Sequence, residues 1–249
     1  LWKCPAWDRQ RRDPMRGWTL AGLSSLLPPC ALVTGLLPAC PSLLAARSTA
    51  EAPIELPPPQ HIAGKAHTDG SCLHPTDPLL SRAGRSVSVP GPAGLCTLAQ
   101  QCVAGRQTIG RAELSALVWL THCSGDFTVS TDCLYLQKRF ARFPTGPLPQ
   151  PWTAGINGDP WKLVRRTDLT VTCIRSHILE ADVVLSGFTW EDWLGNRAAD
   201  IGAGQLAATL VLPPAIVSRR ERTLASDVQG RRSRPRAPPP AGPPHCQTA

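Results

Sequence analysis

Proline is distributed unevenly along this 249-residue chain, and this distribution most constrains where a packed domain can form. Residues 1–60 hold ten of the 27 prolines and residues 213–249 hold eight, whereas the much longer segment 61–212 holds nine. Proline breaks helices and is excluded from the middle of sheets, so dense proline is typical of irregular chain. We therefore expect one folded domain over 61–212, after a Pro/Leu-rich leader and before a disordered Pro/Arg-rich tail.

The leader, residues 1–60, is expected to be irregular or the remnant of an upstream domain. Its segment 19–46 is apolar, but four prolines interrupt it before a run of about 18 apolar residues is reached, so no membrane span is expected. The apolar run also starts late for a secretory signal. The chain begins with Leu1 rather than Met, and we expect a fragment of a longer product.

The net charge is +8, and the tail 213–249 supplies most of it, because seven Arg there face only Glu221 and Asp227. An excess of basic over acidic residues favours polyanionic partners such as nucleic acid, although a solvated basic tail explains the charge equally well. Ten cysteines are scattered without a Cys-x-x-Cys pair, so neither a zinc site of the usual spacing nor a disulfide framework is expected. Reduced thiols are the default, and we expect an intracellular protein, in the cytoplasm or the nucleus.

The periodicity of the middle segment predicts an α/β domain, a mixed sheet with helices packed on it. Three strand candidates come first and would form an antiparallel meander, although the second is short and its turn is proline-rich; they are 62–69, 85–89 and 95–103. Four further elements follow; they are a helix over 111–123, a strand over 127–131, a helix over 133–141 and a strand over 169–173. Residues 178–194 are interpreted as an irregular insert, and Asn196 as the N-cap of a last helix that turns Ala199, Ala203, Leu206 and Leu210 towards the core.

Four acidic residues occupy positions from which they could converge. Asp69 ends the first strand at an Asp-Gly-Ser turn, and Asp132 follows the strand 127–131. Glu113 and Asp200 would lie near the starts of two helices. Because carboxylates packed together repel one another, a bound divalent cation would relieve the repulsion. Periodicity leaves open whether the four side chains meet.

Six short stretches, in this order, resemble the ribonuclease H domain, in particular the version found in retroelement polyproteins. They are Thr68–Ser71, Gln107–Leu114, Ser130–Cys133, Asn157–Trp161, Ile174–His177 and Gly195–Asp200. The resemblance covers about 62–211. It implies a ribonuclease H-like fold, a five-stranded mixed sheet flanked by helices, and an endonuclease that hydrolyses the RNA strand of an RNA–DNA hybrid. It also implies a place in a retrotransposon polyprotein, with an upstream reverse transcriptase domain as a partner.

The family's functional residues carry over onto this sequence one by one. Its four catalytic, metal-binding carboxylates correspond to Asp69, Glu113, Asp132 and Asp200, and its mobile-loop histidine to His177. Substrate contacts correspond to Gly70, Ser71, Thr108, which would hold a phosphate of the DNA strand, and Asn196. The implied cofactor is Mg²⁺ or Mn²⁺, since hard oxygen ligands suit both. Two such ions, about 3.5–4 Å apart, would activate a water and stabilise the leaving oxygen, with Asp69 bridging them.

The sequence departs from the family pattern in places that leave alternatives open. Cys133 follows the third carboxylate where many relatives have Ser. The insert 178–194 is longer than usual, which leaves open whether His177 reaches the site. Asp182 and Asp192 in that insert compete with Asp200 for the role of fourth ligand. Lys138, Arg139 and Arg142 would hold backbone phosphates or form an ordinary solvated helix end. Two other functions remain: a ribonuclease H-like module that binds nucleic acid without cleaving it, and another nuclease or strand transferase of the same superfamily.

Overall fold

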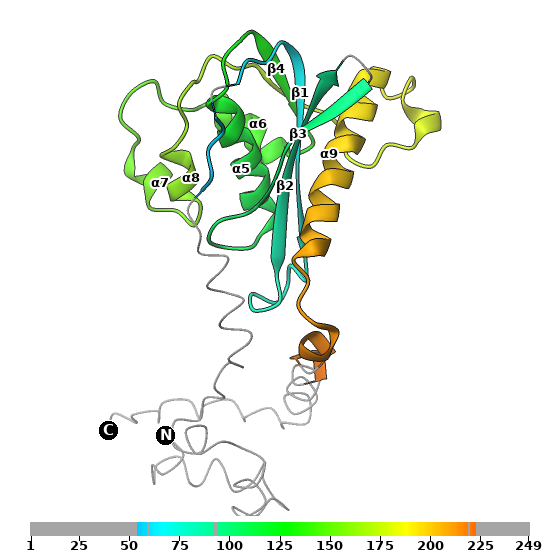
Figure 1. The fold of residues 1–249 in the computed structure, drawn as a ribbon. Helices are drawn as coiled ribbons and strands as arrows, with labels where there is room; N and C mark the ends of the chain where they lie inside the picture. Colours follow the sequence, from blue (N-terminus) through cyan, green and yellow to red (C-terminus); the bar gives the residue numbers. More distant parts are fainter. Residues whose placement is uncertain (1–53, 59, 92–93, 219, 223–249) are drawn as a thin grey trace, which may run out of the picture. The chain divides into compact units, whose positions relative to one another are not determined.

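The structure, a computed structural model, describes residues 54–58, 60–91, 94–218 and 220–222 (Figure 1). The chain divides into two compact units, residues 41–212 and residues 1–40 together with 213–249. The expectations for the leader up to residue 53 and for the tail from 223 lie outside the described residues. Of the second unit, the described part is a short helical stretch within Pro214–Arg222. No single helix of the described residues is long and apolar enough to cross a membrane.

The unit 41–212 is built on a five-stranded sheet in the order β3-β2-β1-β4-β5. The first three strands form an antiparallel meander, and β4 and β5 continue the sheet parallel to β1. Their bounds are Gly64–Leu73 for β1, Arg82–Gly91 for β2, Gly94–Cys102 for β3, Phe127–Thr131 for β4 and Val171–Cys173 for β5. The mixed sheet that the sequence predicts is therefore confirmed, with β2 extended to ten residues and a bulge between Val87 and Ser88.

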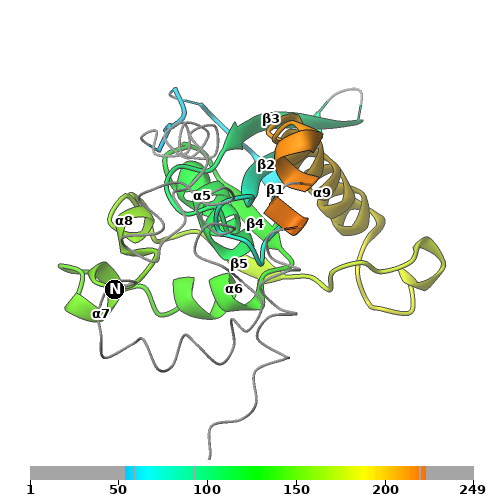
Figure 2. The same cartoon turned by 90° about the horizontal axis from the view of Figure 1, so that it is seen from below.

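Helices cover both faces of this sheet. The two views agree that α5 lies on one face and α9 on the other, with α6 on the side of α5 (Figures 1 and 2). The helices are α5 (Ile109–Thr121), α6 (Leu134–Phe140), α7 (Gln150–Thr153), α8 (Gly158–Trp161) and α9 (Trp190–Thr209), and a 3-10 turn, η3, spans Glu180–Asp182. The predicted order of strands and helices is thus confirmed, with α7, α8 and η3 added in segments that we expected to be loops or turns.

The main core lies between the sheet and α5. Every residue of α5 from Arg111 to Thr121 is buried, because the helix is enclosed by the sheet and by the segment that carries α6 to α8. Packing begins before residue 61: Arg85 Nη2 donates to the Glu55 carbonyl and Ser124 N to the Gln60 carbonyl, both at 2.8 Å. The folded unit therefore uses residues on the N-terminal side of the expected boundary.

The other face is covered by α9 through small residues. An added Cβ on Gly195 would lie 2.2 Å from the His67 ring, and one on Gly202 would lie 2.4 Å from Ser86 Oγ. Together with buried Ala199 and Ala203, these glycines let the helix approach β1 and β2 closely. Two further residues expected to face the core, Leu206 and Leu210, are only half-buried.

The start of α9 differs from the prediction. The helix begins at Trp190, and Thr189 is its N-cap: Thr189 Oγ1 accepts from Asp192 N, and Asp192 caps the backbone in return. Asn196 therefore lies in the second turn, and Asp200 a turn further on. The prediction missed this capping box, in which the residue three positions after the cap is usually Glu or Gln but is Asp here.

Candidate active site

The site begins where β1 meets α5, and Gly70 sets the distance between them. The expected Asp-Gly-Ser turn is wrong: β1 continues to Leu73, and Asp69 pairs with Ser86 of β2 inside the sheet. A Cβ on Gly70 would lie 2.4 Å from Glu113 N and 2.6 Å from Ala112 Cβ. Glycine is needed here because α5 packs its backbone directly on the strand. This close approach brings Glu113 to Asp69.

Strand β4 supplies the third carboxylate. It runs parallel to β1 with Thr68 opposite Thr131, so Asp132, the residue after the strand, follows in the same direction as Asp69. The Thr131 hydroxyl contacts Glu113 Oε2 at 3.4 Å and accepts a hydrogen bond from Cys133 N at 3.2 Å. Thr131 thus links the carboxylate of Glu113 to the start of α6.

The three carboxylates form one compact cluster. Asp69, Glu113 and Asp132 each place an oxygen within 4.8 Å of the other two. Asp69 is 6% exposed and Glu113 is 3% exposed, so water screens them poorly. Gly70 N donates to Asp69 Oδ1 at 2.7 Å. Three acidic groups this close, two of them buried and Asp132 half-buried, resist being charged together.

The pKa values of all three groups are raised. Burial raises the pKa of Asp69 to about 6, and the charges of Asp132 and Asp200 add to the rise, while hydrogen bonds with Glu113 and Gly70 N oppose it. Burial and the neighbouring Asp69 raise the pKa of Glu113 well above its ordinary value. Burial also raises the pKa of Asp132; Asp200 adds to this, and His177 opposes it.

The donor set fits a hard divalent cation. It consists of carboxylate oxygens, the ligands that Mg²⁺ and Mn²⁺ prefer, in a cluster whose mutual repulsion a cation would relieve. Asp69, Glu113 and Asp132 are the residues that would hold it.

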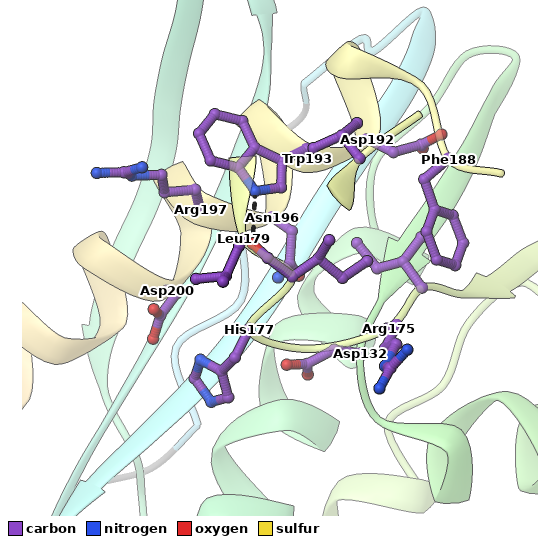
Figure 3. A pocket seen from close by; sticks show the side chains of 13 residues that line it. Asp132, Arg175, His177, Leu179, Phe188, Asp192, Trp193, Asn196, Arg197 and Asp200 are labelled. Carbon is purple, nitrogen blue, oxygen red and sulfur yellow. Dashed lines mark hydrogen bonds between the residues drawn. The ribbon is translucent and has the colours of Figure 1, made fainter. Parts of the chain in front are cut away.

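Two of the predicted residues lie beside the cluster rather than in it. Asp200 and His177 line, together with Asp132, a pocket of about 260 Å³ (Figure 3). Figure 3 shows these three side chains at the same end of the pocket. His177 is exposed and has a φ of 53°, a left-handed conformation that is uncommon for any residue other than glycine and occurs often at functional sites. The insert after His177 therefore does not carry it away from Asp132.

The four predicted substrate-contacting residues do not share one location: one lies at the pocket, one caps α5 and two lie on β1. Asn196 lines the same pocket, and its Oδ1 is buried without a hydrogen-bond partner among the described residues. Thr108 is the N-cap of α5, where its hydroxyl accepts from Arg111 N at 3.3 Å. Gly70 faces α5, whereas the Ser71 hydroxyl lies towards Gly204 of α9.

Neither competing fourth ligand belongs to the carboxylate cluster, although Asp192 lines the same pocket. Asp192 binds Lys65 Nζ at 2.8 Å and caps α9, and these hydrogen bonds outweigh burial and lower its pKa. Asp182 is exposed on η3. Of the basic residues considered for phosphates, Arg139 stacks over the Trp152 ring at 4.2 Å, while Lys138 and Arg142 are exposed.

Sequence reasoning missed the residues that support the cluster rather than form it. Thr131 is a second contact of Glu113, and its position directly before Asp132 was the available signal. Gly195, which makes room for the His67 ring, stands directly before Asn196 in the stretch Gly195–Asp200 that resembles the family. The apolar wall of the pocket, which includes Phe188, lies in the segment interpreted as an insert.

Comparison with known proteins gives structural neighbours but no sequence match. No family model and no curated protein matches the chain. The foamy viral protease-reverse transcriptase in complex with dsDNA is 19% identical, with a TM-score of 0.41 over 58% of this chain and 94% of that one. RNase H1 from Halobacterium salinarum NRC-1 is 15% identical, with a TM-score of 0.38 over 59% and 99%. LC11-RNase H1, isolated from compost, is 15% identical, with a TM-score of 0.36 over 58% and 95%.

These likenesses concern the fold alone, and the argument for it rests on the chain's own topology. A five-stranded mixed sheet with the meander on one side of β1, the parallel strands on the other and helices on both faces is the ribonuclease H-like fold that the resemblance implies. The carboxylate cluster lies where β1, β4 and α5 meet.

Proposed function

We propose that this chain is a metal-dependent endonuclease that hydrolyses the RNA strand of RNA–DNA hybrids. The observation that carries the proposal is the cluster of Asp69, Glu113 and Asp132, whose oxygens lie within 4.8 Å of one another inside a ribonuclease H-like fold. Buried carboxylates with raised pKa values are costly to a fold, and such groups concentrate at functional sites. The set of six ordered motifs supports the same assignment.

Different side chains of the site would bind the metal, orient its ligands and transfer a proton. Asp69, Glu113 and Asp132 would hold Mg²⁺ or Mn²⁺, two ions in the family pattern, which when bound activate a water for attack on phosphorus and stabilise the leaving oxygen. Thr131 and Gly70 N orient two of these carboxylates. Asp200 adds negative charge at the pocket. The exposed imidazole of His177, held beside Asp132, accepts or returns a proton at a ring nitrogen.

The proposed substrate is recognised by shape and charge. A hybrid duplex is A-like, so its wide minor groove and 2′-hydroxyls are read instead of its base sequence. Exposed Lys138 and Arg142 on and after α6, and Arg175 at the pocket, would bind backbone phosphates, and such binding weakens as salt rises. We also propose that the domain comes from a retrotransposon polyprotein, where an upstream reverse transcriptase domain would supply the hybrid.

A panel of substrates tests the proposal. The full chain would be given an RNA–DNA hybrid, the same RNA single-stranded and the matching DNA duplex, each with Mg²⁺, with Mn²⁺ or with a chelator. We expect cleavage of the RNA strand of the hybrid alone, and only with a divalent ion. Metal-independent binding of the hybrid without cleavage would overturn the proposal and favour a binding module.

A further inference from the structure

The pocket beside the carboxylates has a second, apolar end. At one end it is lined by Asp132, His177 and Asp200, the residues next to the metal-binding cluster. Away from them the wall is mainly apolar and includes Leu179, Phe188 and Trp193, with the Asp192 carboxylate, which binds Lys65, beside Phe188 (Figure 3). Ile178 and Val183 also line the pocket. A ligand whose charged group lies at the carboxylates would therefore place an uncharged, apolar part against this wall.

The wall is held in place by defined contacts. Trp193 Nε1 donates to the Ile178 carbonyl at 2.9 Å, which ties the segment to α9 (Figure 3). The Trp190 ring packs edge-on against Trp193, with 5.6 Å between centroids, and Val183 is fully buried. The half-buried ring of Phe188 completes the lining. The apolar end is thus pre-formed, and a ligand would meet little cost of ordering it.

The polar atoms and the size of the pocket restrict the ligand further. Asn196 Oδ1 is buried, lines the pocket and lacks a partner among the described residues, so a donor N–H or O–H on the ligand would satisfy it. The volume of about 260 Å³ falls just under the 300–1,000 Å³ of drug-sized sites. This is room for one ring system and its sugar, and too little for a segment of duplex.

We propose that this pocket binds a single unstacked nucleobase of the strand whose phosphate lies at the carboxylates. The inference rests on the proposed function for the position of the phosphate. A nucleobase has the flat apolar face that Phe188 and Val183 accommodate and N–H donors that the unpartnered Asn196 Oδ1 can accept from. Because unstacking a paired base costs free energy, and least at ends and mismatches, the enzyme would prefer RNA nucleotides at frayed or mismatched positions.

Calorimetric titration of the full chain in Mg²⁺ tests the base subsite directly. The probes are adenosine 5′-monophosphate, uridine 5′-monophosphate and ribose 5-phosphate, which has the same sugar phosphate without a base. We expect the nucleotides to bind on the order of tenfold tighter, the size of one base–aromatic contact. Equal affinities for nucleotides and ribose 5-phosphate would overturn the proposal.

Variants of Phe188 test whether its ring causes the difference in affinity between the nucleotides and ribose 5-phosphate. Phe188→Ala should remove the base-dependent gain, and Phe188→Tyr, which keeps the ring, should retain it. Leu185→Ala is the matched control, because Leu185 lies in the same segment, is 85% exposed and is not part of the lining. A base-dependent gain that survives Phe188→Ala, or that Phe188→Tyr also abolishes, would contradict the placement of the base against this ring.

The titration can fail or succeed independently of the proposed nuclease activity. The titration breaks no bond, so a chain that fails to cleave hybrids still reports on the pocket. Conversely, a chain that cleaves hybrids in Mg²⁺ without any base-dependent binding would overturn this inference alone. In cleavage assays, hybrids with a mismatch at the RNA terminus should be cut there faster than fully paired ones, and equal rates would count against the subsite.

Discussion

At the scale of single residues, Gly70 decides whether the acidic groups meet. The sequence was sufficient to select Asp69, Glu113 and Asp132 as candidates, because each falls in a short ordered motif. It was not sufficient to show why they converge, since Asp-Gly-Ser is typical of a turn. The close contact between β1 and α5 depends on the absent side chain of Gly70, and only the packed structure reveals it.

Replacing Gly70 with alanine should separate the two elements. The added Cβ would lie 2.4 Å from Glu113 N, so α5 must shift, which by analogy with overpacked cores costs roughly 1–3 kcal/mol. We expect Gly70→Ala to lower the free energy of unfolding by that amount in urea denaturation and to reduce hybrid cleavage strongly.

Gly110→Ala is the control for that experiment. An added Cβ at Gly110, in the first turn of α5, meets nothing within 4 Å. Alanine there should leave stability unchanged or raise it by up to about 1 kcal/mol, because alanine favours helix. If both alanine variants behaved alike, the close approach at Gly70 would not be what positions Glu113.

At the scale of elements, the interiors of helices and strands were predictable and their ends were not. The strand 127–131 and the helix after Asp132 follow from apolar spacing, and both are confirmed. The N-cap of α9 was misplaced by seven residues, at Asn196 instead of Thr189, because the capping box of Thr189 and Asp192 lies in a stretch with no helical period of apolar residues. Its packed face is made of glycine and alanine, which hydrophobic periodicity does not detect.

The N-cap of α6 offers a test at this scale. Cys133 occupies the cap position and makes no side-chain capping hydrogen bond, whereas serine is a preferred N-cap residue. Cys133→Ser should therefore raise the free energy of unfolding by about 0.5–1 kcal/mol. Urea denaturation measures this, with exposed Cys96→Ser as the control that should change nothing. A destabilised Cys133→Ser chain would show that the thiol packs better than a hydroxyl caps.

At the scale of the whole molecule, the fold holds acidic groups that favour protonation unless a cation is bound. The ribonuclease H-like sheet follows from strand order and from the resemblance, so this level was the most predictable. The raised pKa values of the carboxylates were not predictable, since they depend on how deeply Asp69 and Glu113 are buried. Asp69→Asn should therefore stabilise the metal-free protein while removing one of the proposed metal ligands.

In a chelator, the contribution of Asp69 to stability should fall as pH rises. The folded pKa of Asp69, about 6, lies above its ordinary value of 3.8, so the folded state binds protons more tightly than the unfolded state. This contribution of Asp69 is full below pH 4 and is lost as pH rises through 6, and a rise in pKa from 3.8 to about 6 corresponds to about 3 kcal/mol. Glu113 acts in the same direction.

Urea denaturation of the chain and of Asp69→Asn at pH 4 and pH 8 measures this loss as a difference, because His67, whose pKa burial lowers to about 4, adds stability as pH rises through the same window. Mg²⁺ should restore stability at pH 8 and have little effect at pH 4, where the carboxyl groups are protonated. Asp69→Asn should remove the Asp69 part of the loss and weaken the response to Mg²⁺. A metal-free chain that gains stability between pH 4 and pH 8, in parallel with its Asn variant, would contradict the raised pKa.

The most direct test of the central claim is the rate of RNA-strand cleavage at saturating Mg²⁺ for the full chain and for Asp69→Asn. Asp168→Asn is the control, since Asp168 is an acidic residue with a side chain 67% exposed, paired with Arg166 outside the site. We predict that Asp69→Asn loses at least about a thousandfold in rate, because several kcal/mol of transition-state stabilisation would depend on the metal that Asp69 is proposed to hold. Asp168→Asn should cleave at the unmodified rate. Cleavage by Asp69→Asn within a few-fold of the unmodified chain would contradict the account.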